Sequence, residues 1–113
     1  MKILELGHVV LYVTNLERSA SFYRDVLGFP EVGRMIFPSG NGAAAFSSGR
    51  THHELLLIEI GGKPKPEHFP EPGLYHIGFK VADTHDELKK VYQELKAKNV
   101  PITGARDHTV THS

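Results

Sequence analysis

Two histidines stand at equivalent points of a repeated phrase in this chain. The first phrase begins at Gly7 and reads Gly-His-Val-Val-Leu-Tyr-Val, and the second begins at Tyr75 and reads Tyr-His-Ile-Gly-Phe-Lys-Val. His8 and His76 therefore each open an apolar segment. Imidazole is a common ligand of divalent metals, and the chain has no cysteine that could supply a thiolate. The repeat predicts that pseudo-symmetry brings two imidazoles together to hold a metal.

Each phrase is followed by the start signal of a helix. Thr14 and Thr84 both precede a glutamate by three residues, which is the spacing of a capping box. Thr14 or Asn15 is expected to cap the first helix, with an apolar stripe at helical spacing and a stop at Gly28. Thr84 is expected to cap the second helix, and Asn99 is a plausible stop.

The first half of the chain has the pattern of a βαβββ module. Apolar or alternating segments predict strands at 5–13, 29–36, 43–46 and 51–60, and turn-forming residues separate the last three. Four prolines then make 61–73 a connection without regular structure.

The second half begins as a copy of the first. Residues 74–82 are expected to repeat the opening strand, and the second helix follows them. Further strands begin near Ile102 and Thr109, so only about one and a half of the three expected strands are present. We therefore expect the second module to be incomplete at its C-terminal end within these 113 residues.

Composition narrows the class of protein. A length of 113 residues fits one domain, and 13 basic side chains balance 13 acidic ones. No basic block is present, which argues against a nucleic-acid partner. No apolar run approaches a membrane span and the N-terminus lacks the pattern of a signal peptide, so we expect no membrane partner and a cytoplasmic location.

The opening from His8 to Phe29 resembles the vicinal oxygen chelate superfamily, which includes glyoxalase I, extradiol catechol dioxygenases and bleomycin-binding proteins. The resemblance covers essentially the whole chain. It implies an α+β fold in which paired βαβββ modules form a cup-shaped mixed sheet. It also implies one domain, 1–113, made of a first module (1–60), a connection (61–73) and an incomplete second module (74–113).

Within the superfamily, the histidines look most like those of the extradiol dioxygenase branch. By this resemblance His8 and His76 are metal ligands, and the third ligand is a glutamate on a final strand that lies beyond Ser113. His52 or His53, at the start of the long strand, is an acid–base residue. The same resemblance assigns contact with bound oxygen or a substrate hydroxyl to one of two further histidines, His108 and His112. Neighbouring strand residues face opposite ways, so only one of His52 and His53 can point into the cup.

The resulting hypothesis is an extradiol-type dioxygenase that uses Fe(II) or Mn(II) to cleave a small aromatic vicinal diol. The first alternative is a glyoxalase-like lyase acting on a 2-oxoaldehyde-derived substrate, with Zn(II) or Ni(II) held in part by Glu54 or Glu59. The second alternative is a non-enzymatic module that sequesters a flat ligand. A homodimer is expected, because small relatives usually pair and an incomplete half-sheet invites a partner strand.

Overall fold

The structure is a computed structural model that describes residues 1–63, 72–74 and 76–102. The chain divides into two compact units, Met1–Phe69 and Pro70–Ser113. The boundary between them falls inside the proline-rich connection that the sequence predicts.

The first unit is a four-stranded sheet with one helical segment. Its strands are β1 (Val9–Val13), β2 (Glu31–Ile36), β3 (Gly42–Phe46) and β4 (Leu55–Glu59), in the spatial order β1-β4-β3-β2. The pair β1–β4 is parallel, and the pairs β4–β3 and β3–β2 are antiparallel. Helix α1 (Leu16–Ser21) and the π-helical turn η1 (Phe22–Val26) follow β1. This βαβββ order confirms the module predicted for the first half of the chain.

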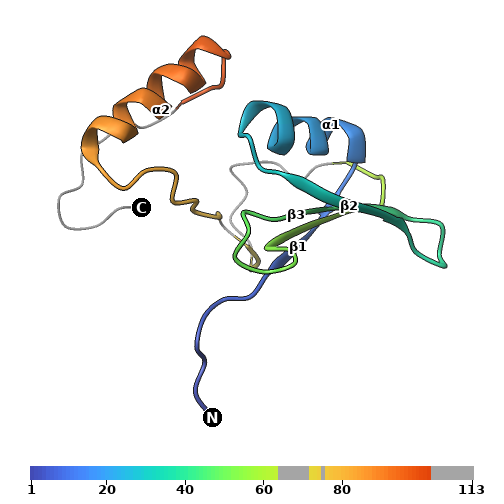
Figure 1. The fold of residues 1–113 in the computed structure, drawn as a ribbon. Helices are drawn as coiled ribbons and strands as arrows, with labels where there is room; N and C mark the ends of the chain where they lie inside the picture. The colour runs from blue at the N-terminus through green and yellow to red at the C-terminus, as the bar shows by residue number, and fades with distance from the viewer. Residues whose placement is uncertain (64–71, 75, 103–113) are drawn as a thin grey trace. The chain divides into compact units, whose positions relative to one another are not determined.

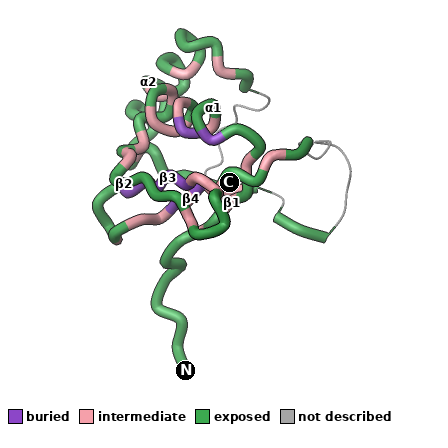
Figure 2. Tube along the Cα trace, turned by 90° about the vertical axis from the view of Figure 1, so that its right-hand side faces the viewer, coloured by how far each residue is buried: buried purple, intermediate pink, exposed green. Residues whose placement is uncertain are grey.

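Helix α1 lies over one face of the sheet (Figure 1). The core between them consists of buried residues of α1, β3 and β4, with partly buried side chains such as Tyr23 and Phe29 packed against it (Figure 2). Its fully buried large side chains are Phe46, Leu55 and Leu57. Small residues at Ala20 and Ala44 let the helix approach the strands closely, and both are fully buried.

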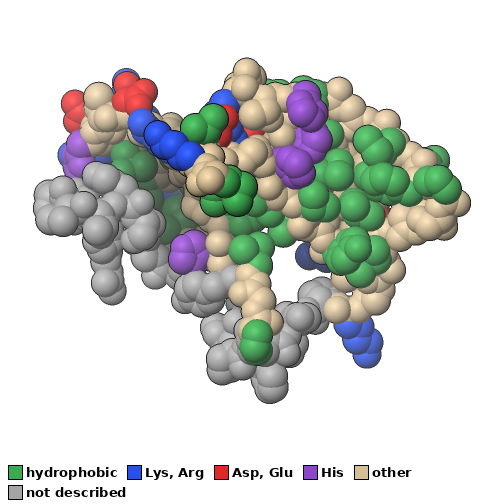
Figure 3. Space-filling view, turned by 90° about the horizontal axis from the view of Figure 1, so that it is seen from below, with side chains coloured by type: hydrophobic (Ala, Val, Ile, Leu, Met, Phe, Trp, Pro, Cys, Tyr) green, Lys and Arg blue, Asp and Glu red, His purple; other side chains and the backbone are tan. Residues whose placement is uncertain are grey.

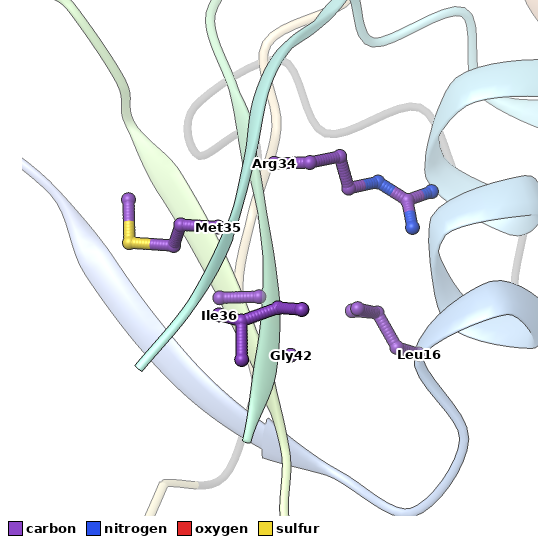
Figure 4. A pocket seen from close by; sticks show the side chains of 6 residues that line it. Leu16, Arg34, Met35, Ile36 and Gly42 are labelled. Carbon is purple, nitrogen blue, oxygen red and sulfur yellow. The ribbon is translucent and has the colours of Figure 1, made fainter. Parts of the chain in front are cut away.

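Strand β2 is tied to α1 by an ion-pair network. The Arg34 guanidinium donates to both carboxylate oxygens of Glu31, at 2.9 and 3.1 Å, and also to the Glu17 carboxylate on α1. Arg34 and Met35 point to opposite sides of β2, as the alternation of a strand requires (Figure 4). The hollow between α1 and the β2–β3 hairpin, which Arg34 lines, contains no histidine.

The sheet face that points away from α1 carries a continuous apolar row. The strand registers place Tyr12 beside Ile58, Ile58 beside Ala43, and Ala43 beside Met35. A second row begins with Val10 beside Leu56. Within the first unit, Tyr12 is 71% exposed and Met35 47% exposed. His8 directly precedes β1, two residues before Val10.

The predicted cap of the first helix is settled in favour of Asn15. Its side-chain oxygen accepts a hydrogen bond from the backbone N–H of Arg18 at 3.1 Å. The capping box that begins at Thr14 is therefore wrong, and Glu17 pairs with Arg34 instead of closing it. The helical segment ends at Val26, and Gly28 shortly after it has a φ of 73°, the expected left-handed stop.

The second unit contains helix α2 (His85–Ala97). The Thr84 hydroxyl accepts from the Glu87 N–H at 3.2 Å, which confirms the predicted cap. Asn99, with a φ of 59°, follows the helix at the predicted stop. The apolar stripe of α2 includes Leu88 and Tyr92, and no residue of this helix is fully buried in the described structure.

Three predicted strands differ from the observed ones. The strand predicted at 5–13 begins only at Val9, and the strand predicted at 51–60 begins only at Leu55. Residues 76–82 form no regular strand. A strand is stabilised by pairing its backbone groups, and the described residues of the second unit offer no partner strand to this segment.

No helix in the described part of the chain is long and apolar enough to cross a lipid bilayer.

Removing the cap of α1 should destabilise the first unit. Asn15→Ala leaves the Arg18 N–H without its side-chain acceptor, so the free energy of unfolding should fall by about 0.5–2 kcal/mol. Thr14→Ala is the matched control and should change it by less than about 0.5 kcal/mol. Urea unfolding followed by circular dichroism measures both. A larger loss in Thr14→Ala than in Asn15→Ala would restore the original capping box.

Candidate functional site

The pairing of β1 with β4 brings one predicted ligand next to one predicted acid–base residue. Val9 is in register with Leu55, and its N–H donates to the Glu54 carbonyl at 2.9 Å. His8 directly precedes β1, and His53 lies two residues before β4. The two histidines, 45 positions apart in the sequence, therefore meet at the same end of the sheet.

Three imidazoles gather at this end. The ring centroids of His8 and His53 are 4.8 Å apart with an interplanar angle of 47°. His52 packs edge-on against His53, with centroids 4.7 Å apart. His53 is partly buried, whereas His8 and His52 are exposed. In the view from below, histidine side chains lie next to hydrophobic side chains on the surface (Figure 3). Within the first unit His53, rather than His52, contacts the predicted ligand.

The surroundings of His53 favour its neutral form. Burial lowers the pKa of the His53 imidazole, and the charges that His52 and His8 can carry lower it further, against a smaller opposing effect of Glu54. A neutral imidazole offers a nitrogen lone pair that can accept a proton or bind a metal. The arrangement therefore presents a neutral imidazole next to His8 at neutral pH.

The two glutamates considered as glyoxalase-type ligands both have structural partners. The Glu54 carboxylate accepts from the backbone N–H of Ser48 at 3.2 Å and from its hydroxyl, which lowers the pKa of the Glu54 carboxyl. Glu59 alternates with the buried residues Leu55 and Leu57, and its carboxylate accepts the Leu16 N–H at the start of α1 at 2.6 Å. Their role as metal ligands stays a prediction.

The remaining predicted site residues lie elsewhere. His76 belongs to the second unit, so its partnership with His8 stays a prediction. His108 and His112 lie outside the described residues. Across residues 1–63, 72–74 and 76–102, no three His, Asp or Glu side chains gather in a metal-binding arrangement. The imidazole of His8 suits Fe(II), Zn(II) or Ni(II), and Mn(II) would need oxygen ligands beside it.

Sequence reasoning missed the residues that hold this site in place. By sequence pattern alone, Arg50 belongs to a turn and Thr51 to the start of the strand predicted at 51–60. In the structure Arg50 binds the backbone before His8, and Thr51 binds the backbone of His53. The available signal was the run Ser-Ser-Gly-Arg-Thr before His52, which is rich in hydroxyl groups that form local hydrogen bonds with the backbone.

Residues 5–113 match the sequence model of the Glyoxalase/Bleomycin resistance protein/Dioxygenase superfamily. The chain belongs to this superfamily. The resemblance noted in the sequence, which is to the same group of proteins under another name, is thereby confirmed. The glyoxalase family protein from Enterococcus faecalis has a similar fold, with a TM-score of 0.76 and 23% identity over 98% of this chain and 85% of that one.

Curated relatives within the superfamily have different activities. The chain is 37% identical over 94 residues to catechol-2,3-dioxygenase of Bacillus subtilis, covering 80% of this chain but 31% of the relative. It is 27% identical over 101 residues to the manganese-dependent 2,3-dihydroxybiphenyl 1,2-dioxygenase of Geobacillus genomosp. 3, covering 89% of this chain and 28% of that one. Lactoylglutathione lyase of Neisseria meningitidis serogroup A is 28% identical over 92 residues, with coverages of 80% and 67%.

These relatives support an enzyme of the superfamily without selecting the reaction. The chain spans about a third of the length of the two dioxygenases that it matches. One of the relatives is named as manganese-dependent, and relatives of this kind act on small molecules. Superfamily membership alone does not determine chemistry, because one fold hosts several activities.

The pKa of His53 should lie below that of an ordinary histidine in the metal-free protein. In His52→Asn one repelling charge is gone, so the pKa of His53 should rise while burial still keeps it below 6.5. His53 binds protons less readily in the folded protein than in the unfolded one. Its titration therefore lowers the free energy of unfolding as the pH falls below about 6.5 and has no such effect at higher pH. NMR titration of the ring protons measures the pKa in both proteins. A His53 pKa at or above the ordinary value would contradict the described environment.

Proposed function

We propose that this chain carries out extradiol-type cleavage of a small aromatic vicinal diol, using dioxygen and a divalent metal, Fe(II) or Mn(II). The proposal is supported by the two dioxygenases among its relatives, one of them 37% identical. One observation carries it: the rings of His8 and His53 lie together, with their centroids 4.8 Å apart. This contact places a candidate ligand beside a candidate base.

In the proposed site His8 would hold the metal together with His76, and the third ligand stays unassigned. The metal, when bound, supplies Lewis acidity and a template that orients the two diol oxygens and dioxygen. Extradiol cleavage adds both atoms of dioxygen and breaks one ring carbon–carbon bond next to the diol, so it needs no external reductant. The part left to the protein is to bind the ring and to move a proton.

His53 is the residue that we assign to the proton transfer. Its lowered pKa leaves the imidazole neutral, so a ring nitrogen can accept the proton of a diol hydroxyl and return it later in the reaction. His52 packs against His53 and is exposed, which suits a supporting role better than direct contact with substrate. His108 or His112 is proposed to contact the bound oxygen or the substrate hydroxyl.

The apolar sheet face offers a surface for a flat ring. Val10 and Tyr12 extend from His8 along β1, and Leu56 and Ile58 lie beside them on β4. Burying a ring there removes apolar area from water, while the histidines at one end supply the polar contacts that orient the hydroxyl groups. We also propose that the protein works as a homodimer in the cytoplasm.

Two histidine variants separate metal binding from proton transfer. His8→Ala should lose both the metal and ring cleavage, because it removes a ligand. His53→Gln should keep the metal but lower kcat by about 10²- to 10⁴-fold, because it removes only the base. Metal content is measured by elemental analysis, and cleavage by the absorbance of the ring-opened product of catechol. His85→Ala is the control, since His85 is the first residue of α2 and has no proposed role.

Full metal content and activity in His8→Ala would contradict the proposed site. A chain that binds no metal, even after reconstitution, yet binds a flat ligand tightly in the presence of chelator would be a sequestering module instead.

The lyase relative favours one alternative, a glyoxalase-like lyase with Zn(II) or Ni(II). Glu59→Gln tests it, because the glutamine carbonyl can still accept the Leu16 N–H while the negative charge is removed. We expect metal content to be unchanged in this variant, since Glu59 points toward α1. Loss of metal in Glu59→Gln, with thermal stability preserved, would favour the lyase.

A further inference from the structure

The loop between β3 and β4, residues 47–54, is held internally by side-chain hydrogen bonds, while backbone hydrogen bonds tie its end residues Ser47 and Glu54 to neighbouring segments. The Ser47 hydroxyl, on a buried residue, donates to the Thr51 carbonyl at 2.6 Å and accepts the Gly49 N–H at 3.0 Å. At the far end, Glu54 accepts from Ser48. Both ends of the loop are therefore closed on the loop itself, which makes it a defined structure and not a loose connection.

Thr51 fixes the backbone of His53. Its hydroxyl donates to the His53 carbonyl at 2.7 Å and accepts from the His53 N–H at 3.1 Å. One oxygen therefore contacts both polar groups of the same residue. Because Ser47 in turn holds the Thr51 carbonyl, the direction in which the His53 side chain leaves the backbone depends on this pair of hydroxyl groups.

Arg50 fixes the approach to His8 from the same loop. Its guanidinium donates to the carbonyls of Leu6 and Gly7 at 3.0 and 3.2 Å, and it pairs with the Glu5 carboxylate at 3.0 Å. These residues directly precede His8 and lie before β1 begins, so the ladder with β4 does not position them. A guanidinium suits this task because its planar fork can reach several acceptors at once.

We infer that Arg50 and Thr51 are positioning residues that set the separation of the His8 and His53 rings. Arg50 acts on the segment before His8, and Thr51 acts on His53 itself, from neighbouring places in one loop. The effect on ring geometry stands by itself. Its catalytic meaning rests on the proposed function, because only there must a ligand and a base keep a fixed distance.

Isosteric variants test this inference. Thr51→Val keeps the shape of threonine but removes the hydroxyl, whereas Thr51→Ser keeps the hydroxyl. Arg50→Met removes the guanidinium, and Arg18→Met, on an exposed arginine of α1, is its control. The readout is the nuclear Overhauser effect between the ring protons of His8 and His53 in the full, metal-free chain. Thermal unfolding is followed in parallel.

The nuclear Overhauser effect between the two rings should vanish or weaken in Thr51→Val and Arg50→Met. It should persist in Thr51→Ser and Arg18→Met, and all four variants should have similar melting temperatures. An unchanged effect in both Thr51→Val and Arg50→Met would overturn the inference. If the proposed function also holds, Thr51→Val should lower kcat by about 100-fold with little change in KM, and Thr51→Ser should restore it. Loss of the ring contact in a chain whose wild type shows no cleavage would reject the function and keep the positioning role.

Discussion

The candidate site depends on the parallel pairing of β1 with β4. These strands are separated in sequence by a helical segment and two other strands, yet the register of Val9 with Leu55 brings His8 to His53. A shift of one residue in this register would move His8 relative to His53. It would also pair the residues of the apolar row with different residues of the neighbouring strand. The register is specified by burial, because Leu55 and Leu57 must face α1 for the core to close. The packing of one face thus determines what the other face presents.

Much of the first unit could be predicted from the sequence. The period of the apolar residues indicated the βαβββ order, and Gly28 marked the end of the helical segment. The histidine phrase indicated His8 as a site residue, and the structure adds His53 as its neighbour. What pattern alone could not decide was which neighbouring polar residue forms a given hydrogen bond. Thr14 and Asn15 both have an oxygen that can cap a helix, and only the backbone conformation at Asn15 gives it the role.

The loop before β4 shows a second limit of sequence reasoning. Residues 51–54 continue directly into an apolar strand and resemble part of it, but the hydroxyl groups of Ser47 and Thr51 compete with the ladder for backbone partners. The strand therefore begins at Leu55. Because residues 51–54 form a loop, the alternation of strand residues does not decide which of His52 and His53 meets His8. In the structure it is His53. The partnership of His8 with His76 involves two units and could be inferred only from the repeat and from resemblance.

The proposed placement of a base beside a metal ligand poses a physical difficulty that this arrangement reduces. Two imidazoles in contact repel each other when both are protonated, and a flexible pair would separate to relieve that repulsion. Here His53 is partly buried and its pKa is lowered, so the contact with His8 is retained with a neutral ring. The backbone on both sides is held by the Thr51 hydroxyl and by the Arg50–Glu5 ion pair. The separation of the two rings can then stay constant while the charge at the site changes, and the proposed proton transfer beside a metal would require that constancy.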